Sequence, residues 1–456
     1  MTVVRSAMLL VLVSLLGASQ AVAQTSRGGE SALLPELTLN RLGLTRSWWG
    51  HAVTNRQRDR MTYVTADEDL MIAQSSTGIV SAFDPETGRL RWFHQVGETD
   101  SPAYPASFND SHVFILNAGQ LIALNRKKGD VAFALPMPGQ ANASAVADEK
   151  QVYVGCLDGS MFAFDLAQIT ELHRQGRLKA YGDATVLWRY RTSKPIASPA
   201  VLQGSHVVFS SLNGSVYSVA ALNRKLAFQF ETDAELSAPM VRYKDLLILA
   251  SEDFNVYAID MLSGRLAWQF TTGMIIKKAP VVIENDLYVI PEYGSLYKVN
   301  AATGERLWKR PGIKSFLAAT PQRLYVVDQS DNLRVLSRSN GDSIGQLPLQ
   351  TFKLRFINST SDRIFLGTES GLVTAIRERD REFPTYYQRP ERQPISPAIA
   401  PDGTDGAPPA AGLNGEMNSD GDTNSDGEMP AEDGEGANPF GEGATEESTD
   451  EPEEDN

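Results

Sequence analysis

The chain has 456 residues and a formal net charge of −14. The acidity is concentrated at the C-terminus: residues 399–456 contain 18 Asp and Glu and no Lys or Arg, so the other 398 residues carry 42 basic and 38 acidic side chains. This nearly neutral main part has no basic stripe, which argues against a nucleic-acid-binding protein, and its length suits one large repeat fold with tails.

The N-terminus has the pattern of a secretory signal peptide. Arg5 precedes an apolar run at residues 7–16, and Ala21-Val-Ala23 has the spacing of a cleavage site. The run is too short to cross a bilayer as a helix, no cysteine follows it for lipid attachment, and no later segment predicts a transmembrane helix. We expect a cleavable signal peptide at 1–23, a loose leader at 24–41, and a periplasmic or secreted protein that is not a lipoprotein.

A seven-residue motif then returns eight times: Gly, any residue, apolar, any residue, small, apolar, Asp or Asn. Its first positions are 41, 40, 55, 40, 40, 37 and 40 residues apart. A period near 40 with strand-like alternation predicts one four-stranded blade per repeat, and hence an all-β, eight-bladed β-propeller over residues 42–377. The copies begin at Gly78, Gly119, Gly159, Gly214, Phe254, Gly294, Asp331 and Gly371.

Each repeat predicts four strands, of which the motif is the third. An apolar run such as 246–250 precedes it, and in six of the repeats an aromatic residue ends the fourth strand. Glycine permits positive φ in the turns, and the aromatic side chain is large enough to fill the wedge between blades, so we expect both to be structural. The tryptophans of this set are Trp48, Trp92, Trp188, Trp268 and Trp308.

The two ends of the repeat region complement each other. The last repeat, which runs through Arg377, has no aromatic fourth strand, while an unmatched segment at 45–50 precedes the first repeat. Trp48 lies 44 residues before Trp92, where the missing aromatic would be. We predict that this N-terminal strand completes the eighth blade, which protects the ring from opening and leaves only short edges.

Three further segments depart from the repeat. The 55-residue spacing places extra polar and basic residues at 167–185, which predicts a short surface helix that is either part of a binding face or a tolerated loop expansion. Residues 378–398 contain Pro and Arg and either form a linker or pack along the ring. The tail at 399–456 is rich in Gly, Asp and Glu and is expected to be disordered.

The acidic tail also contains a candidate Ca²⁺ loop. Asp422, Asn424, Asp426 and Asp433 have the spacing of its oxygen ligands. However, Asp433 replaces the usual Glu, Pro430 interrupts the loop, and a solvated acidic tail is the alternative interpretation.

Other residues with reactive or metal-binding side chains do not form a recognisable site. Cys156 is the single cysteine, so an internal disulfide is impossible, and its apolar strand context favours a small buried residue over a catalytic thiol. The five histidines lack the spacing of metal ligands. They are at positions 51, 94, 112, 173 and 206.

The repeats resemble the PQQ-like (pyrroloquinoline quinone) repeat family. The resemblance is carried by the period near 40 residues and by the segments 256–268 and 295–308, in each of which a Gly is followed four residues later by a closing Trp. The likeness covers about 42–377. It implies one of two kinds of protein: a quinoprotein dehydrogenase with PQQ and Ca²⁺ in the central funnel, or a non-catalytic scaffold of the BamB type. Many such dehydrogenases carry an adjacent cysteine pair, which this chain cannot form. BamB is a lipoprotein, and the lipid-attachment cysteine is absent here.

We therefore expect an exported, non-enzymatic β-propeller that acts as a protein-binding scaffold in cell-envelope or outer-membrane protein assembly. It would have no catalytic residues and no PQQ, with Ca²⁺ only in the tail. Its partners would be other envelope or secreted proteins, and the chain would be a monomer or one subunit of a complex. The alternative is a PQQ- and Ca²⁺-dependent quinoprotein dehydrogenase.

Overall fold

The structure is a computed structural model that describes residues 33–55, 59–98 and 101–388. These residues belong to one unit, 1–396, and a second unit, 397–456, lies outside them. The expected signal peptide at 1–23, the acidic tail at 399–456 and the candidate Ca²⁺ loop also lie outside the described residues.

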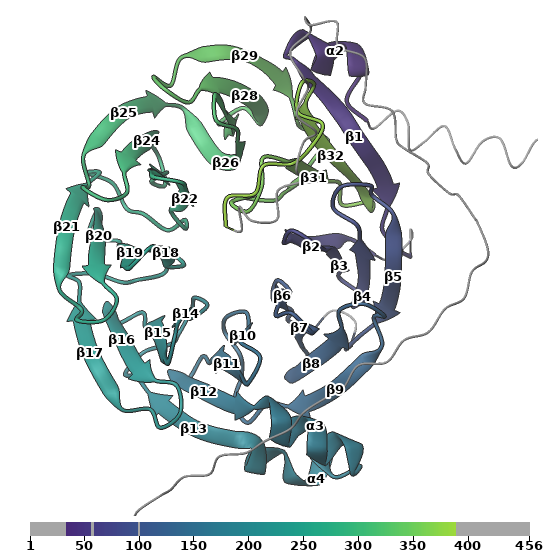
Figure 1. Ribbon diagram of the computed structural model, residues 1–456, viewed down its shortest axis with the longest axis vertical. Helices are drawn as coiled ribbons and strands as arrows, with labels where there is room; N and C mark the ends of the chain where they lie inside the picture. Colours follow the sequence, from purple (N-terminus) through teal and green to yellow (C-terminus); the bar gives the residue numbers. More distant parts are fainter. Residues whose placement is uncertain (1–32, 56–58, 99–100, 389–456) are drawn as a thin grey trace, which may run out of the picture. The chain divides into compact units, whose positions relative to one another are not determined.

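The described residues form eight four-stranded antiparallel sheets arranged as the blades of a propeller, which confirms the predicted fold (Figure 1). The strands of each blade are given from the centre outwards. Blade 1 contains β2 (Met61–Ala66), β3 (Met71–Ser75), β4 (Ile79–Phe83) and β5 (Leu90–Gln95), and blade 2 contains β6 (Ser107–Phe108), β7 (His112–Asn117), β8 (Gln120–Asn125) and β9 (Val131–Pro136). Blade 3 contains β10 (Val146–Ala147), β11 (Gln151–Gly155), β12 (Ser160–Asp165) and β13 (Val186–Arg191), and blade 4 contains β14 (Val201–Gln203), β15 (His206–Ser210), β16 (Ser215–Ala220) and β17 (Leu226–Glu231). Blade 5 contains β18 (Val241–Tyr243), β19 (Leu246–Ala250), β20 (Asn255–Asp260) and β21 (Leu266–Thr271), and blade 6 contains β22 (Val281–Ile283), β23 (Asp286–Val289), β24 (Ser295–Asn300) and β25 (Arg306–Pro311). Blade 7 contains β26 (Ile313–Ala319), β27 (Arg323–Asp328), β28 (Asn332–Ser337) and β29 (Ser343–Pro348), and blade 8 contains β30 (Leu354–Arg355), β31 (Ile364–Gly367), β32 (Leu372–Glu378) and β1 (Leu44–His51).

The burial of each strand follows its place in the blade. The second and third strands, such as β19 and β20, are buried along most of their length because neighbouring blades cover both of their faces. The fourth strand, such as β21, alternates between exposed and half-buried residues because it forms the outer edge. The core therefore lies between the blades.

The N-terminal strand closes the ring, as predicted. β1 pairs antiparallel with β32, from Leu44 opposite Glu378 to His51 opposite Leu372. The Thr374 hydroxyl donates a 2.8 Å hydrogen bond to the Trp48 carbonyl. Blade 8 thus takes its outermost strand from the other end of the repeat region.

The segment before β1 is more ordered than the loose leader that the sequence suggested. Helix α2 (Glu36–Arg41) lies beside β1 (Figure 1), and Leu39 is fully buried in the core between blades 7 and 8. Glu36 accepts a 2.7 Å hydrogen bond from the Thr45 hydroxyl. The residues just before the ring therefore pack on it.

Each repeated tryptophan joins its own blade to the next one. Its indole N–H donates to a carbonyl one or two residues after the third strand of the neighbouring blade, and most of the rings also cover a glycine of that blade's last turn. The N–H to O pairs are Trp48–Pro85, Trp92–Arg126, Trp188–Ala221, Trp268–Ala301 and Trp308–Arg338, at 2.8, 3.0, 2.6, 3.2 and 3.2 Å.

The turn between the second and third strands has a left-handed residue in seven of the eight described blades. Phe254 and Asp331 have φ of 74° and 60° even though they replace glycine. The exception is Gly294, whose φ lies outside the left-handed range, contrary to the expectation for this position. In other blades a backbone N–H closes the turn, as from Ser251 to the Asn255 carbonyl, whereas Pro291 has no N–H to donate. The left-handed glycines are Gly78, Gly119, Gly159, Gly214 and Gly371.

Contact with the tryptophans gives a test of the blade junctions. Gly88 and Gly176 both have φ of 68°, but a Cβ at Gly88 would lie 2.4 Å from the Trp48 ring, while one at Gly176 would meet nothing within 4 Å. We expect Gly176→Ala to cost about 1 kcal/mol of backbone strain, and Gly88→Ala to cost about 2–4 kcal/mol because overpacking is added. Urea unfolding measures both, and equal losses would show that the ring contact carries no energy.

Candidate functional site

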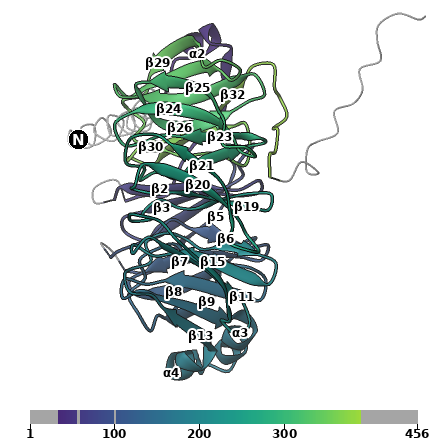
Figure 2. The same ribbon diagram turned by 90° about the vertical axis from the view of Figure 1, so that its left-hand side faces the viewer.

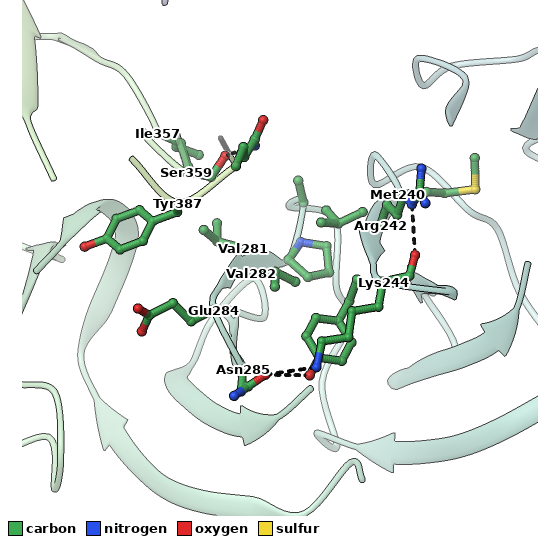
Figure 3. Close-up of a pocket in the computed structure, with 15 residues that line it drawn as sticks. Met240, Arg242, Lys244, Val281, Val282, Glu284, Asn285, Ile357, Ser359 and Tyr387 are labelled. Atoms are coloured by element: carbon green, nitrogen blue, oxygen red, sulfur yellow. Dashed lines mark hydrogen bonds between the residues drawn. The ribbon is translucent and has the colours of Figure 1, made fainter. Parts of the chain in front are cut away.

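A cavity of about 940 Å³ opens at the centre of the ring beside blades 5 and 6 (Figure 3). The innermost strands β18 and β22 form one wall. Ile357 and Ser359 of blade 8 and the C-terminal residues Tyr387 and Gln388 form another. The cavity therefore combines segments that lie more than one hundred residues apart in the sequence.

The polar groups in this cavity are mostly engaged with one another. Arg242 donates to the Lys244 carbonyl at 2.9 Å, and the Tyr243 hydroxyl donates to the Asn285 side chain at 2.8 Å. Glu284 forms a 2.8 Å ion pair with Arg338. Within the described part of the chain, Arg242 and Lys244 have no carboxylate within ion-pairing distance, so the cavity wall carries free positive charge.

These donors do not fit a quinone with Ca²⁺. Calcium takes six to eight oxygen ligands, and the carboxylate of the cavity, Glu284, is already paired with a guanidinium. The described residues contain no group of three or more His, Cys, Asp and Glu that could hold a metal ion. Arg242 and Lys244 could attract an anionic group.

The C-terminal segment 379–388 packs on the ring. For this part of residues 378–398, the structure therefore shows packing along the ring rather than a linker. Arg363 is almost fully buried and donates to the carbonyls of Arg381 and Glu382, to Asp362 at 3.1 Å and to Glu86 of blade 1 at 3.1 Å. Burial raises the pKa of both carboxyl groups, partly offset by Arg363. This cluster joins blade 8, blade 1 and the C-terminal segment.

Further along, Tyr387 anchors the same segment against blade 7. Its hydroxyl donates to the Ala319 carbonyl at 2.8 Å, and burial raises its pKa. The segment thereby reaches the edge of the central cavity, where Gln388 is the last described residue.

The insertion in the third repeat forms helices α3 (Leu166–Arg174) and α4 (Leu178–Tyr181) and a 3₁₀ turn, η1 (Gly182–Thr185). Asp165 caps α3 by accepting from two backbone N–H groups. Both helices lie outside the ring next to β9 and β13 (Figures 1 and 2). A groove of about 640 Å³ runs between α3 and the turns of blades 2 and 3, and Leu222 at its rim is 75% exposed.

The repeated residues and Cys156, which the sequence analysis singled out, lie at positions that support the fold. The repeated glycines and tryptophans lie in turns and blade junctions, and Cys156 is buried, which raises its pKa to about 12. Asp422, Asn424, Asp426 and Asp433 lie outside the described residues. Sequence reasoning missed Arg242, Lys244 and Tyr387, because only the folded ring brings them to one cavity.

No helix among the described residues is long and apolar enough to cross a membrane. The blades, their tryptophan junctions and the closure by β1 define an eight-bladed β-propeller.

The chain belongs to the PQQ-like repeat family described as "Outer membrane protein assembly factor BamB", which it matches over residues 76–180 and 169–347. Among solved structures it is similar to BamB from Moraxella catarrhalis, with a TM-score of 0.59, 17% identity, and coverage of 74% of this chain and 98% of that one. It is also similar to the computationally designed Ika8 protein, with a TM-score of 0.56, 14% identity, and coverage of 72% and 99%. No curated protein matches the sequence.

Proposed function

We propose that the protein is an exported, non-enzymatic scaffold that binds other proteins during cell-envelope or outer-membrane protein assembly. The observation that carries the proposal is the family match over residues 76–347, to a family described as an outer membrane assembly factor. Export rests on the signal pattern at residues 1–23. The partners would be envelope proteins.

The architecture suits such a role. The closed ring leaves turns and insertions exposed, which is where repeat proteins place their binding surfaces. The insertion groove and the exposed Leu222 are one such surface. The carboxylate of the central cavity, Glu284, is paired with Arg338, and the described residues contain no metal-binding group of three or more His, Cys, Asp and Glu, which supports a binding role over the dehydrogenase alternative.

We expect the purified full chain to capture a defined set of envelope proteins, and a chain lacking residues 167–185 to capture fewer of them. The matched functional assay adds PQQ and Ca²⁺ to the same protein and measures the quinone spectrum and alcohol- or sugar-dependent dye reduction. Capture without quinone binding is the expected result. Stoichiometric quinone binding with turnover would overturn the scaffold assignment.

A further inference from the structure

Phe254 has a backbone conformation that its side chain does not favour. It stands where six of the eight repeats have glycine, and its φ is 74°. A bulky residue in the left-handed region is an outlier that costs stability. Burial does not recover this cost, because the Phe254 side chain is 45% exposed. A strained aromatic residue that stays on the surface indicates a role outside the stability of the ring.

Two more exposed apolar side chains lie on the adjoining turns. Met274 is 44% and Tyr293 82% exposed. The Thr272 hydroxyl lies 3.0 Å from the Phe254 carbonyl and 2.8 Å from that of Met274, which ties the two turns together. The Met274 sulfur lies 3.2 Å from the point that a Cβ atom would occupy at Gly294, the residue that directly follows Tyr293. We call Phe254, Met274 and Tyr293 the blade 5–6 patch.

The surroundings of the blade 5–6 patch are acidic. Of its charged neighbours, Lys194 pairs with Glu235 at 3.0 Å, and Lys277 lies 3.6 Å from Glu252 and 3.9 Å from Glu292. The Lys278 ammonium donates to the Lys314 carbonyl at 2.6 Å and also interacts electrostatically with Glu292. Acidic side chains on these turns therefore exceed the lysines that pair with them. The acidic side chains are Asp233, Glu235, Glu252, Asp253 and Glu292.

We propose that the blade 5–6 patch docks a segment of a partner protein that presents an apolar side chain beside Lys or Arg. This inference rests on the proposed scaffold function and names the chemistry of one of its partners. Apolar patches with polar rims are typical of protein-binding sites, and aromatic and Met side chains are enriched in them. Opposite charge on the partner segment would set its orientation and speed its encounter. The strain at Phe254 is retained because the exposed ring contacts the partner.

The test places a photo-crosslinking benzoylphenylalanine at position 293 of the full chain in envelope extract and sequences the crosslinked segment. Matched probes stand at Leu262, at the other end of β20, and at Leu222 in the insertion groove. We expect position 293 to yield a partner segment with an apolar residue flanked by Lys or Arg. An acidic segment, a second copy of this chain, or no crosslink above that at position 262 would overturn the inference.

Phe254→Gly separates binding from structure. It should raise the Tm by about 1–3 °C by relieving strain, and lower the crosslink yield at position 293 about tenfold. Arg224→Gly is the matched control, because Arg224 also has a left-handed φ, of 55°, but lies in a turn of blade 4 between its third and fourth strands. It should leave the crosslink unchanged. An unchanged crosslink yield in Phe254→Gly would contradict the inference. Crosslinks at position 222 alone would refute the inference but leave the proposed scaffold function standing. No capture at any position would refute both the inference and the scaffold function.

Discussion

Trp48→Ala is expected to destabilise the ring by about 3–5 kcal/mol, the usual cost of truncating a large buried aromatic residue. The Trp48 side chain is buried against Phe83 and Phe365, and its indole N–H bonds to the Pro85 carbonyl at 2.8 Å. Its loss opens a cavity at the junction where β1 closes the ring and leaves that carbonyl without its donor. Urea unfolding followed by tryptophan fluorescence measures the change.

The adjacent Trp49 provides the control, because it lies in the same strand with the same chemistry but is 43% exposed. Trp49→Ala should cost less than about 1 kcal/mol. Deletion of residues 42–50 should remove the closure altogether and expose the edge of β32 to aggregation. A deleted chain that melts like the full chain would show that blade 8 does not need β1.

Arg363→Met should destabilise the protein by about 3–5 kcal/mol at neutral pH, because it leaves the buried Asp362 carboxylate without its partner. It also removes the bonds to Glu86 and to the carbonyls of Arg381 and Glu382. Increased proteolysis after residue 378 would accompany this loss. Lys194→Met, which removes an exposed ion pair, should cost less than about 1 kcal/mol.

The effect of Arg363→Met should depend on pH. Burial raises the folded-state pKa of the Asp362 and Glu86 carboxyl groups. Each group therefore lowers the stability of the fold as the pH rises through its folded-state pKa, and lowers it least when it is protonated. Without the guanidinium the pKa of Asp362 rises further. The gap between variant and parent should therefore narrow from pH 7.5 to pH 5. A gap that is constant across this range would mean that Asp362 is not the charged group left behind.

The repeat architecture could be predicted because each local signal occurs many times. The motif spacing located the third strands, and the position of Trp48 relative to Trp92 located the closing strand, since the outer strand carries an aromatic residue in seven of the eight described blades. Gly294 was misjudged because the deciding residue was Pro291, which cannot donate the hydrogen bond that closes the other turns.

The candidate binding surfaces could not be predicted in the same way, because they depend on departures from the repeat. The central cavity needs Arg242, Ile357 and Tyr387 together, and no sequence spacing relates them. Phe254 was visible as a replaced glycine, but only its φ and its exposure show that the replacement is strained and on the surface.

The closure by β1 also sets an order of events during synthesis. The first strand to be made is the last to find its partner, because β32 ends 327 residues after β1 does. At about 5–20 residues per second, β1 waits about 15–65 s before its partner has been made. Throughout that interval the blades already made can pair internally, while both ends of the array stay open. The time for which unpaired edges are exposed is therefore fixed by the length of the chain between the two strands, and a chaperone that shields β1 would act in that interval.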